Sequence, residues 1–203
     1  AGTSTQAERL AAWYRGRGLP VHVTHEPTSG PIGSLIHQVL TNRFVVCGMT
    51  GPRAPTWTTM ALLFAADRLD HLEAEILPNL RDGVTVISDR YDLSSLAYQS
   101  QTSSDAESVV SWVRELNRYA RRPDLTLVLD VGADVAARRR ESRAANTELY
   151  EEDELQRHLA TAYRDAERFV PGDKLVHIDG NRGIAAIESE IIAEVKKLRC
   201  EAK

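Results

Sequence analysis

The sequence predicts an α/β fold in three layers, with a mostly parallel β-sheet covered by helices on both faces. Two observations predict it. Short β-rich runs alternate along the chain with longer segments of helical period. Three of the four runs are almost continuously apolar, as strands of a parallel sheet are when both faces are buried. Ligands of such sheets bind beyond the carboxyl ends of the strands, so we expect the functional residues there.

The expected elements follow one another in a regular order. The β-rich runs lie at 21–24, 84–88, 125–129 and 175–178. Apolar residues recur at three-to-four spacing over 62–76, 155–169 and 187–198, which predicts a helix for each of these segments. The segment 44–56 is interrupted by Gly and Pro, and it predicts a loop with some β character.

The composition excludes several classes of protein. The 203 residues are enough for one domain with a full hydrophobic core, and we expect 1–203 to form it. The net charge is −4 and the charges are spread along the chain, which argues against a nucleic-acid-binding protein. No apolar run approaches the ~18 residues of a membrane span. Cys47 and Cys200 match no metal or disulfide spacing, which favours a reduced, cytoplasmic protein.

The first residues, Gly2-Thr3-Ser4-Thr5-Gln6, match the end of a phosphate-binding loop of the pattern G-x-x-x-x-G-K-[ST]. In such a loop backbone N–H groups hold phosphate oxygens, and the Ser or Thr hydroxyl, here that of Ser4, binds Mg²⁺. Thr3 stands at the lysine position. A polar helix N-cap would give the same residues, so this alternative stays open. Because a strand feeds such a loop, we expect a first strand before Gly2, missing from this sequence, to complete a five-stranded sheet.

The strongest local signal follows the run at 84–88. Asp89 and Arg90 come at the carboxyl end of this predicted strand. An Asp at a strand end can hold the water shell of Mg²⁺, and the adjacent Arg offers a fork that matches a phosphate. The alternative is a surface ion pair that caps a helix.

Phe64 and Arg68 are four residues apart, so they lie side by side on one face of the predicted helix. At ~100° per residue, Phe64 lies about 200° from Leu62, where the apolar stripe begins. An aromatic ring off the core stripe beside an arginine suits a planar base with a carbonyl group. A dimer contact is the alternative.

Four arginines crowd the segment 138–143. A solvated helix face accounts for them, and the alternative is a mobile lid, residues 138–150, that folds arginines over transferring phosphates. The histidines predict no metal site. His22 and His25 would point to opposite faces of a strand, and we expect His71 on an exposed helix face.

Together these segments resemble the thymidylate kinase family over essentially the whole chain. The matching strings are G-x-[ST]-T-Q at 2–6, T-x-E-P-x-x-G-P-I-G at 24–33, A-L-L-F-A-A-D-R at 61–68, D-R-Y-x-x-S-x-x-A-Y-Q at 89–99 and P-D-L-T-L-x-L-D-V at 123–131. The third and fourth strings are specific to this family among nucleotide kinases. The resemblance implies a P-loop NTPase fold with a small helical lid, and Mg²⁺-dependent phosphoryl transfer from ATP to dTMP. It also implies a homodimer formed through the helix over 60–80.

The resemblance further implies roles for single residues. The ATP phosphates would be bound by Gly2, Thr3, Ser4 and Thr5, and Mg²⁺ by Ser4 and Asp89, directly or through water. dTMP would be bound by Glu26, Pro27, Phe64, Arg68, Arg90, Ser95, Tyr98 and Tyr150. The catalytic residues would be Asp89, Arg90, Arg140, Arg143 and Glu151. In this arrangement Phe64 stacks on thymine, and Tyr98 lies under the deoxyribose and leaves no room for a 2′-hydroxyl.

Three departures from the family pattern bear on catalysis. Thr3 replaces the usual lysine, His25 replaces the arginine before Glu-Pro, and residues 100–104 replace a glycine-rich stretch. We expect a lid arginine, Arg140 or Arg143, to supply the missing positive charge. Two other functions stay open: a nucleotide-binding relative impaired in catalysis, and a kinase for another nucleoside or deoxynucleoside monophosphate.

Overall fold

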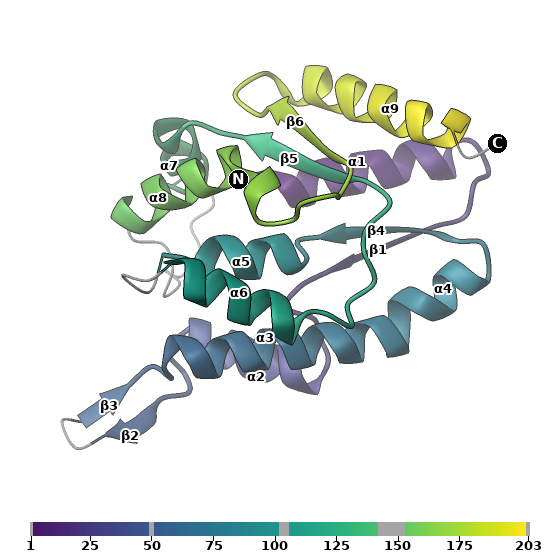
Figure 1. Cartoon of the computed structure of the whole chain (residues 1–203). Helices are drawn as coiled ribbons and strands as arrows, with labels where there is room; N and C mark the ends of the chain where they lie inside the picture. The colour runs from purple at the N-terminus through teal and green to yellow at the C-terminus, as the bar shows by residue number, and fades with distance from the viewer. Residues whose placement is uncertain (1, 49–50, 102–105, 142–152, 202–203) are drawn as a thin grey trace.

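The computed structural model describes residues 2–48, 51–101, 106–141 and 153–201 (Figure 1). It has the mixed α/β architecture that the sequence predicts. The strands are β1 (Val21–His25), β2 (Val46–Gly48), β3 (Gly51–Arg53), β4 (Thr85–Asp89), β5 (Thr126–Asp130) and β6 (Leu175–Asp179). The helices are α1 (Thr3–Arg15), α2 (Pro31–Leu40), α3 (Trp57–His71), η1 (Leu72–Ile76), α4 (Leu77–Arg81), α5 (Asp92–Gln99), α6 (Ala106–Leu116), α7 (Ala133–Glu141), α8 (Asp153–Arg164), η2 (Ala166–Arg168) and α9 (Ile184–Glu201).

The long strands form two parallel pairs. β1 pairs with β4, so that His25 lies opposite Asp89 at their carboxyl ends. β5 pairs with β6, so that Asp130 lies opposite Asp179. Each parallel pair therefore carries charged or titratable residues at its carboxyl end, the edge where the sequence predicts the functional residues.

A cavity of about 840 Å³ lies between β4 and β5. Within the described residues these two strands pair with β1 and β6 but not with each other. The cavity is lined by both strands and by side chains of the flanking helices, among them Leu10 of α1 and Ile191 of α9. The described strands do not form the predicted five-stranded sheet; the long strands form two parallel pairs, and β4 and β5 line this cavity.

Helices pack on both sides of the strands (Figure 1). α1 and α9 lie side by side, and Leu10 and Ile191 form a buried cluster with Ile178 of β6. On the other side α5 and α8 pack against β5 through a cluster that includes Leu96 and Val128. Burying an aliphatic side chain of this size contributes roughly 1.5–3 kcal/mol, so these clusters hold the layers together. No helix in the described ranges is both long and apolar enough to cross a bilayer.

Local residues fix where two helices begin. α1 starts after Gly2, whose φ of 100° lies in the left-handed region that favours glycine. α2 starts at Pro31, which suits a first helical position because no backbone N–H donor is needed there. Thr3, Ser4 and Thr5, which the sequence predicts to bind phosphate, therefore form the first turn of α1.

Within the segment 44–56, β2 and β3 pair antiparallel as the two arms of a hairpin. This confirms the β character predicted for it. Figure 1 shows the hairpin projecting from the body of the protein beyond α2 and α3. Phe44 and Val45, just before β2, are 42% and 41% exposed.

Two expectations for α3 were wrong. Leu62 is 51% exposed, whereas Met60 and Ala65 are buried. α3 packs against α2 and also against α5 and α6, so its buried surface is wider than one apolar stripe. His71 is buried, not exposed, because both of its ring nitrogens have hydrogen-bond partners inside the protein. These partners are Thr24 of β1 and Glu26, the residue that follows β1.

Candidate active site

The carboxyl end of β4 lies beside the N-terminus of α1. Ser4 Oγ donates a hydrogen bond of 2.5 Å to Asp89 Oδ2. The other carboxylate oxygen, Oδ1, is buried and has no hydrogen-bond partner among the described residues. Gly2 is the N-cap of α1, and Thr3, Ser4 and Thr5 form its first turn, where unpaired backbone N–H groups favour an anion. A hydroxyl, a carboxylate and a helix N-terminus therefore meet at one place.

These groups fit a magnesium ion. Mg²⁺ takes hard oxygen ligands, and it usually keeps several waters beside one or two protein ligands. Ser4 and Asp89 supply such oxygens, and Oδ1 of Asp89 is an acceptor that no hydrogen bond occupies in the described part of the protein. No group of three or more His, Cys, Asp and Glu side chains suited to a metal occurs among the described residues. A metal held here would therefore also need water or substrate ligands.

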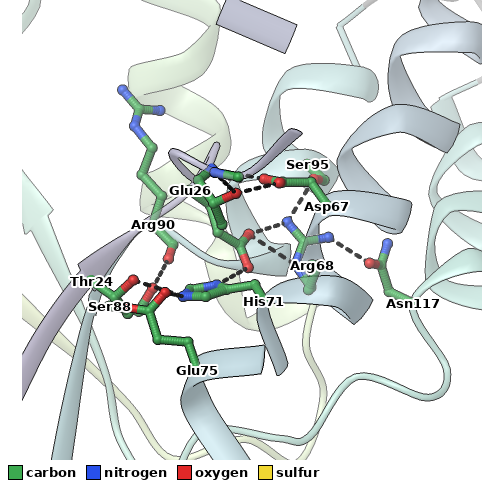
Figure 2. A network of polar contacts seen from close by, with 12 residues as sticks. Thr24, Glu26, Asp67, Arg68, His71, Glu75, Ser88, Arg90, Ser95 and Asn117 are labelled. Carbon is green, nitrogen blue, oxygen red and sulfur yellow. Dashed lines mark hydrogen bonds and ion pairs between the residues drawn. The ribbon is translucent and has the colours of Figure 1, made fainter. Parts of the chain in front are cut away.

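Arg90 stands in an unusual backbone conformation. Its φ is 75°, in the left-handed region that residues with a side chain rarely adopt. Ser88 Oγ donates to the Arg90 carbonyl at 2.6 Å and holds this turn. The guanidinium donates to Tyr98 Oη at 3.3 Å and lies 5.6 Å from the centre of that ring. Conformations held against their intrinsic cost cluster at functional sites, and Figure 2 shows the Arg90 side chain extending away from the buried network.

A cavity of about 470 Å³ opens beside these residues, a volume typical of sites for small organic ligands. Of the residues that the sequence predicts for the site, it is lined by Ser4, Glu26, Pro27, Phe64, Arg68, Asp89, Arg90, Ser95 and Tyr98. Residues that no motif singled out also line it, among them Glu8, His37 and Gln156, and so does Arg139 of the arginine-rich segment 138–143. The structure thus brings residues of the predicted phosphate, metal and base sites into one space.

The loop after β1 is tied to α3. The buried Asp67 carboxylate accepts hydrogen bonds from the Thr28 backbone N–H at 2.8 Å and from Thr28 Oγ1 at 2.6 Å. A Cβ on Gly33 would lie 2.1 Å from the Thr28 carbonyl oxygen, so only glycine fits there. These contacts fix the loop that carries Glu26 and Pro27, which are joined by a cis peptide bond.

Arg68 and Glu26 form a buried ion pair, with side chains 1% and 3% exposed (Figure 2). Arg68 Nε and Nη2 donate to Glu26 Oε2 at 3.0 and 2.6 Å. Nη1 also donates to Asn117 Oδ1 at 2.5 Å, and Nη2 to Ser95 Oγ at 3.1 Å. Most of the guanidinium donors are thus used within the protein. A contact between Arg68 and a ligand stays a prediction.

Phe64 lies one helical turn before Arg68 and is half-buried. It packs against a cluster that includes Ile36 and Met60, and it also lines the cavity. The ring is therefore supported by the core where it borders the space predicted to hold a base.

Most of the predicted lid lies outside the described residues. Arg143, Tyr150 and Glu151 lie outside them. The backbone of Arg140 belongs to α7, but its side chain is also outside the description. The roles predicted for these four residues stay predictions.

Arg139 is a cavity residue that the sequence did not distinguish from its neighbours. A Cβ added to Gly2 would lie 3.7 Å from Arg139 Nη1, so the guanidinium is beside the start of α1. The only sequence signal was the crowding of arginines over 138–143, which does not say which of them faces the site. The structure therefore places the Arg139 guanidinium beside Gly2, the residue before Thr3, where the family pattern has a lysine.

Comparison with known proteins gives a consistent result. The thymidylate kinase family matches residues 1–191. A probable thymidylate kinase of Pyrococcus horikoshii is 37% identical over 195 residues, which cover 96% of this chain and 90% of that protein. One from Thermococcus kodakarensis is 37% identical over 198 residues, covering 98% and 93%. A thymidylate kinase of Neisseria gonorrhoeae is 35% identical over 196 residues, covering 94% and 89%.

An α/β protein with a helix N-terminus, a strand-end carboxylate and an arginine around one cavity has the parts of a nucleotide-binding phosphotransferase. The matches above narrow this class of protein to one family. The chain belongs to the thymidylate kinase family.

Proposed function

We propose that this chain is a dTMP kinase, which transfers the γ-phosphoryl group of ATP to dTMP and yields ADP and dTDP. The observation that carries the proposal is the cavity of about 470 Å³, which brings Ser4 and Asp89 together with Phe64, Arg90 and Tyr98. The family match over residues 1–191 and the names of the relatives support the same reaction.

The donor end of the site is the N-terminus of α1. Backbone N–H groups from Gly2 to Thr5 bind the ATP phosphates, because they are unpaired there and the helix dipole favours negative charge. Ser4 and Asp89 hold Mg²⁺, which neutralises charge on the phosphates when bound. Asp89 fixes the orientation of the Ser4 hydroxyl through their hydrogen bond.

The acceptor end lies across the cavity. Arg90 binds the phosphate of dTMP, to which its fork of donors is matched. Phe64 stacks on thymine and Ser95 contacts its polar edge. Tyr98 lies under the deoxyribose, and Glu26 and Pro27 border the monophosphate. Holding both substrates in line is the main contribution that a protein makes to phosphoryl transfer.

A lid over 138–150 closes on the nucleotides, excludes water and brings Arg140, Arg143, Tyr150 and Glu151 to the site. Thr3 cannot supply the charge of the usual lysine. An arginine supplies this positive charge instead. The position of the Arg139 guanidinium beside Gly2 supports an arginine from α7 in this role.

The same proposal extends to the sheet and the assembly. An apolar strand leading into Gly2 fills the cavity between β4 and β5 and completes a five-stranded sheet. In support, β4 pairs with β1 and β5 with β6, whereas within the described residues β4 and β5 do not pair with each other. A cytoplasmic homodimer forms through the helical segment 60–80, where the exposed Leu62 offers an apolar contact.

A comparison of acceptors tests the proposed function. With ATP and Mg²⁺, full-length protein should show its highest kcat/KM with dTMP, lower values with dUMP and dCMP, and the lowest with UMP, because Tyr98 excludes a 2′-hydroxyl. A preference for UMP would assign another acceptor. Binding of dTMP without any ADP release would favour the catalytically impaired relative that Thr3 leaves open.

A further inference from the structure

We propose that His71 is a positioning residue of the acceptor site, which holds the Glu26 carboxylate and, through it, the Arg68 guanidinium. The inference rests on the proposed function, because it concerns how the same cavity keeps its shape. Glu26 and Arg68 both line that cavity. His71 comes from the last position of α3 and acts on them from within the protein.

His71 completes the hydrogen bonding of Glu26. Arg68 occupies Oε2 of Glu26 through two contacts, at 3.0 and 2.6 Å. The other oxygen, Oε1, lies 3.3 Å from His71 Nδ1. The side chains of His71 and Glu26 are 0% and 3% exposed, so water does not compete for this oxygen. A buried carboxylate with one oxygen unpaired is costly, and the His71 contact removes that cost.

The His71 ring is itself held from β1. Its Nε2 lies 2.7 Å from Thr24 Oγ1. Thr24 belongs to β1 and Glu26 follows its last residue, so both partners of the ring come from one short segment. Figure 2 shows the ring between these two side chains, with each nitrogen turned to one of them. The orientation of the imidazole is thus set by two separate contacts.

The contact with Glu26 is directional. An ionised carboxylate only accepts hydrogen bonds, so Nδ1 of His71 must carry the hydrogen that reaches Oε1. Nε2 then meets the Thr24 hydroxyl, which can donate or accept. The site therefore requires a donor at the Nδ1 position, and a side chain of similar size without that donor does not replace it.

The network continues to the surface. Glu75 Oε2 lies 3.6 Å from His71 Nε2, and Glu75 Oε1 contacts His22. Partial burial opposes ionisation of Glu75, yet hydrogen bonds from His22 and Thr24 and the nearby His71 hold its pKa below the usual range. Glu75 lies in η1, a π-helical segment that begins directly after His71. Such segments are rare and are frequently found at functional sites.

The experiment compares His71→Gln with His71→Asn. The amide nitrogen of Asn falls near the place of Nδ1, and that of Gln near the place of Nε2. We expect His71→Gln to raise the KM for dTMP about 10- to 100-fold, the range of one hydrogen bond to a charged group. The KM for ATP should stay within about twofold, and His71→Asn should restore most of the dTMP affinity. His158→Asn, at an exposed position of α8, is the matched control.

Equal effects of Asn and Gln, or an equal rise in the KM for ATP, would assign His71 a structural role and overturn the inference. If thermal melting shows that His71→Gln does not fold, Thr24→Val gives a second test. It removes the hydroxyl at Nε2 and should raise the KM for dTMP selectively, and an unchanged KM would contradict the inference. Wild-type protein without dTMP turnover would overturn the proposed function, whereas normal turnover with non-selective variants would overturn this inference alone.

Discussion

The hydroxyl of Ser4 donates a hydrogen bond of 2.5 Å to the carboxylate of Asp89, and this contact joins the first turn of α1 to the last residue of β4. The two residues are 85 positions apart in sequence. A phosphate bound at the start of α1 is therefore placed beside a strand-end carboxylate, the combination that a metal-assisted phosphoryl transfer needs.

Asp89→Asn should lower kcat by about 100-fold, because the site loses a charged ligand for the metal that neutralises the phosphates. Ser4→Ala should act in the same direction. Both should raise the Mg²⁺ concentration that gives half-maximal rate in steady-state assays. Ser189→Ala, which removes an exposed hydroxyl on α9, serves as the control. Unchanged Mg²⁺ dependence in both site variants would show that the metal is held elsewhere.

Arg90→Lys should raise the KM for dTMP about tenfold or more, because an ammonium cannot reproduce the planar fork that matches a phosphate. The control is Arg118→Lys, at an arginine whose ion pair with Glu115 is exposed. Steady-state kinetics with dTMP as the varied substrate measure the effect. An Arg90 variant with wild-type KM for dTMP would remove Arg90 from the acceptor site.

Arg139→Ala should lower kcat by about 100-fold if its guanidinium replaces the lysine charge at Thr3. Thr3→Lys in the same background should recover part of the loss, because it returns a cation to the phosphates. Arg164→Ala, at an exposed position in α8 outside the predicted lid, is the control. Rapid-quench measurement of the transfer step is the readout.

The outcome for the outer lid arginines is separate. Should Arg140→Ala and Arg143→Ala both keep wild-type turnover, neither of them supplies the charge. If Arg139→Ala also keeps wild-type turnover, no arginine of the segment 138–143 is needed to replace the lysine charge.

The pH dependence of stability should report on Glu75. Its folded pKa is lowered, against the effect of its partial burial, by hydrogen bonds from His22 and Thr24. A lowered pKa stabilises the fold above the unfolded value of about 4.3, and this stabilisation is lost as the pH falls through the folded pKa. The difference in Tm between wild type and Glu75→Gln should therefore shrink below about pH 4. Glu73→Gln, its exposed neighbour, should show no such convergence, and a constant gap for Glu75→Gln would contradict the assignment.

The sequence predicts the strands closely because their signal is local. The apolar run at 84–88 became β4 (Thr85–Asp89), and the run at 125–129 became β5 (Thr126–Asp130). The polar residues after these runs could be placed from the geometry of parallel sheets alone. The gathering of Phe64, Arg90 and Tyr98 at one cavity was expected from the family motifs, and these residues do line a common space.

Features set by tertiary contacts could not be predicted in the same way. Helical spacing predicted Leu62 in the core, but α3 packs against several helices and Leu62 is exposed. His71 was expected on an exposed face, but it is buried, because Thr24 of β1 provides a partner for its ring. Arg139 lies beside Gly2 because of how α7 is rotated about its axis. Three consecutive arginines at 138–140 do not indicate that rotation, so the sequence could not single out Arg139.

The most direct test of the dTMP kinase proposal is to follow ATP, Mg²⁺ and dTMP with full-length protein by ³¹P NMR. The proposal predicts ADP and dTDP in equal amounts, formed at about 1–100 s⁻¹, and no ADP when dTMP is left out. ADP release that does not depend on dTMP, or dTMP binding without formation of dTDP, would contradict it.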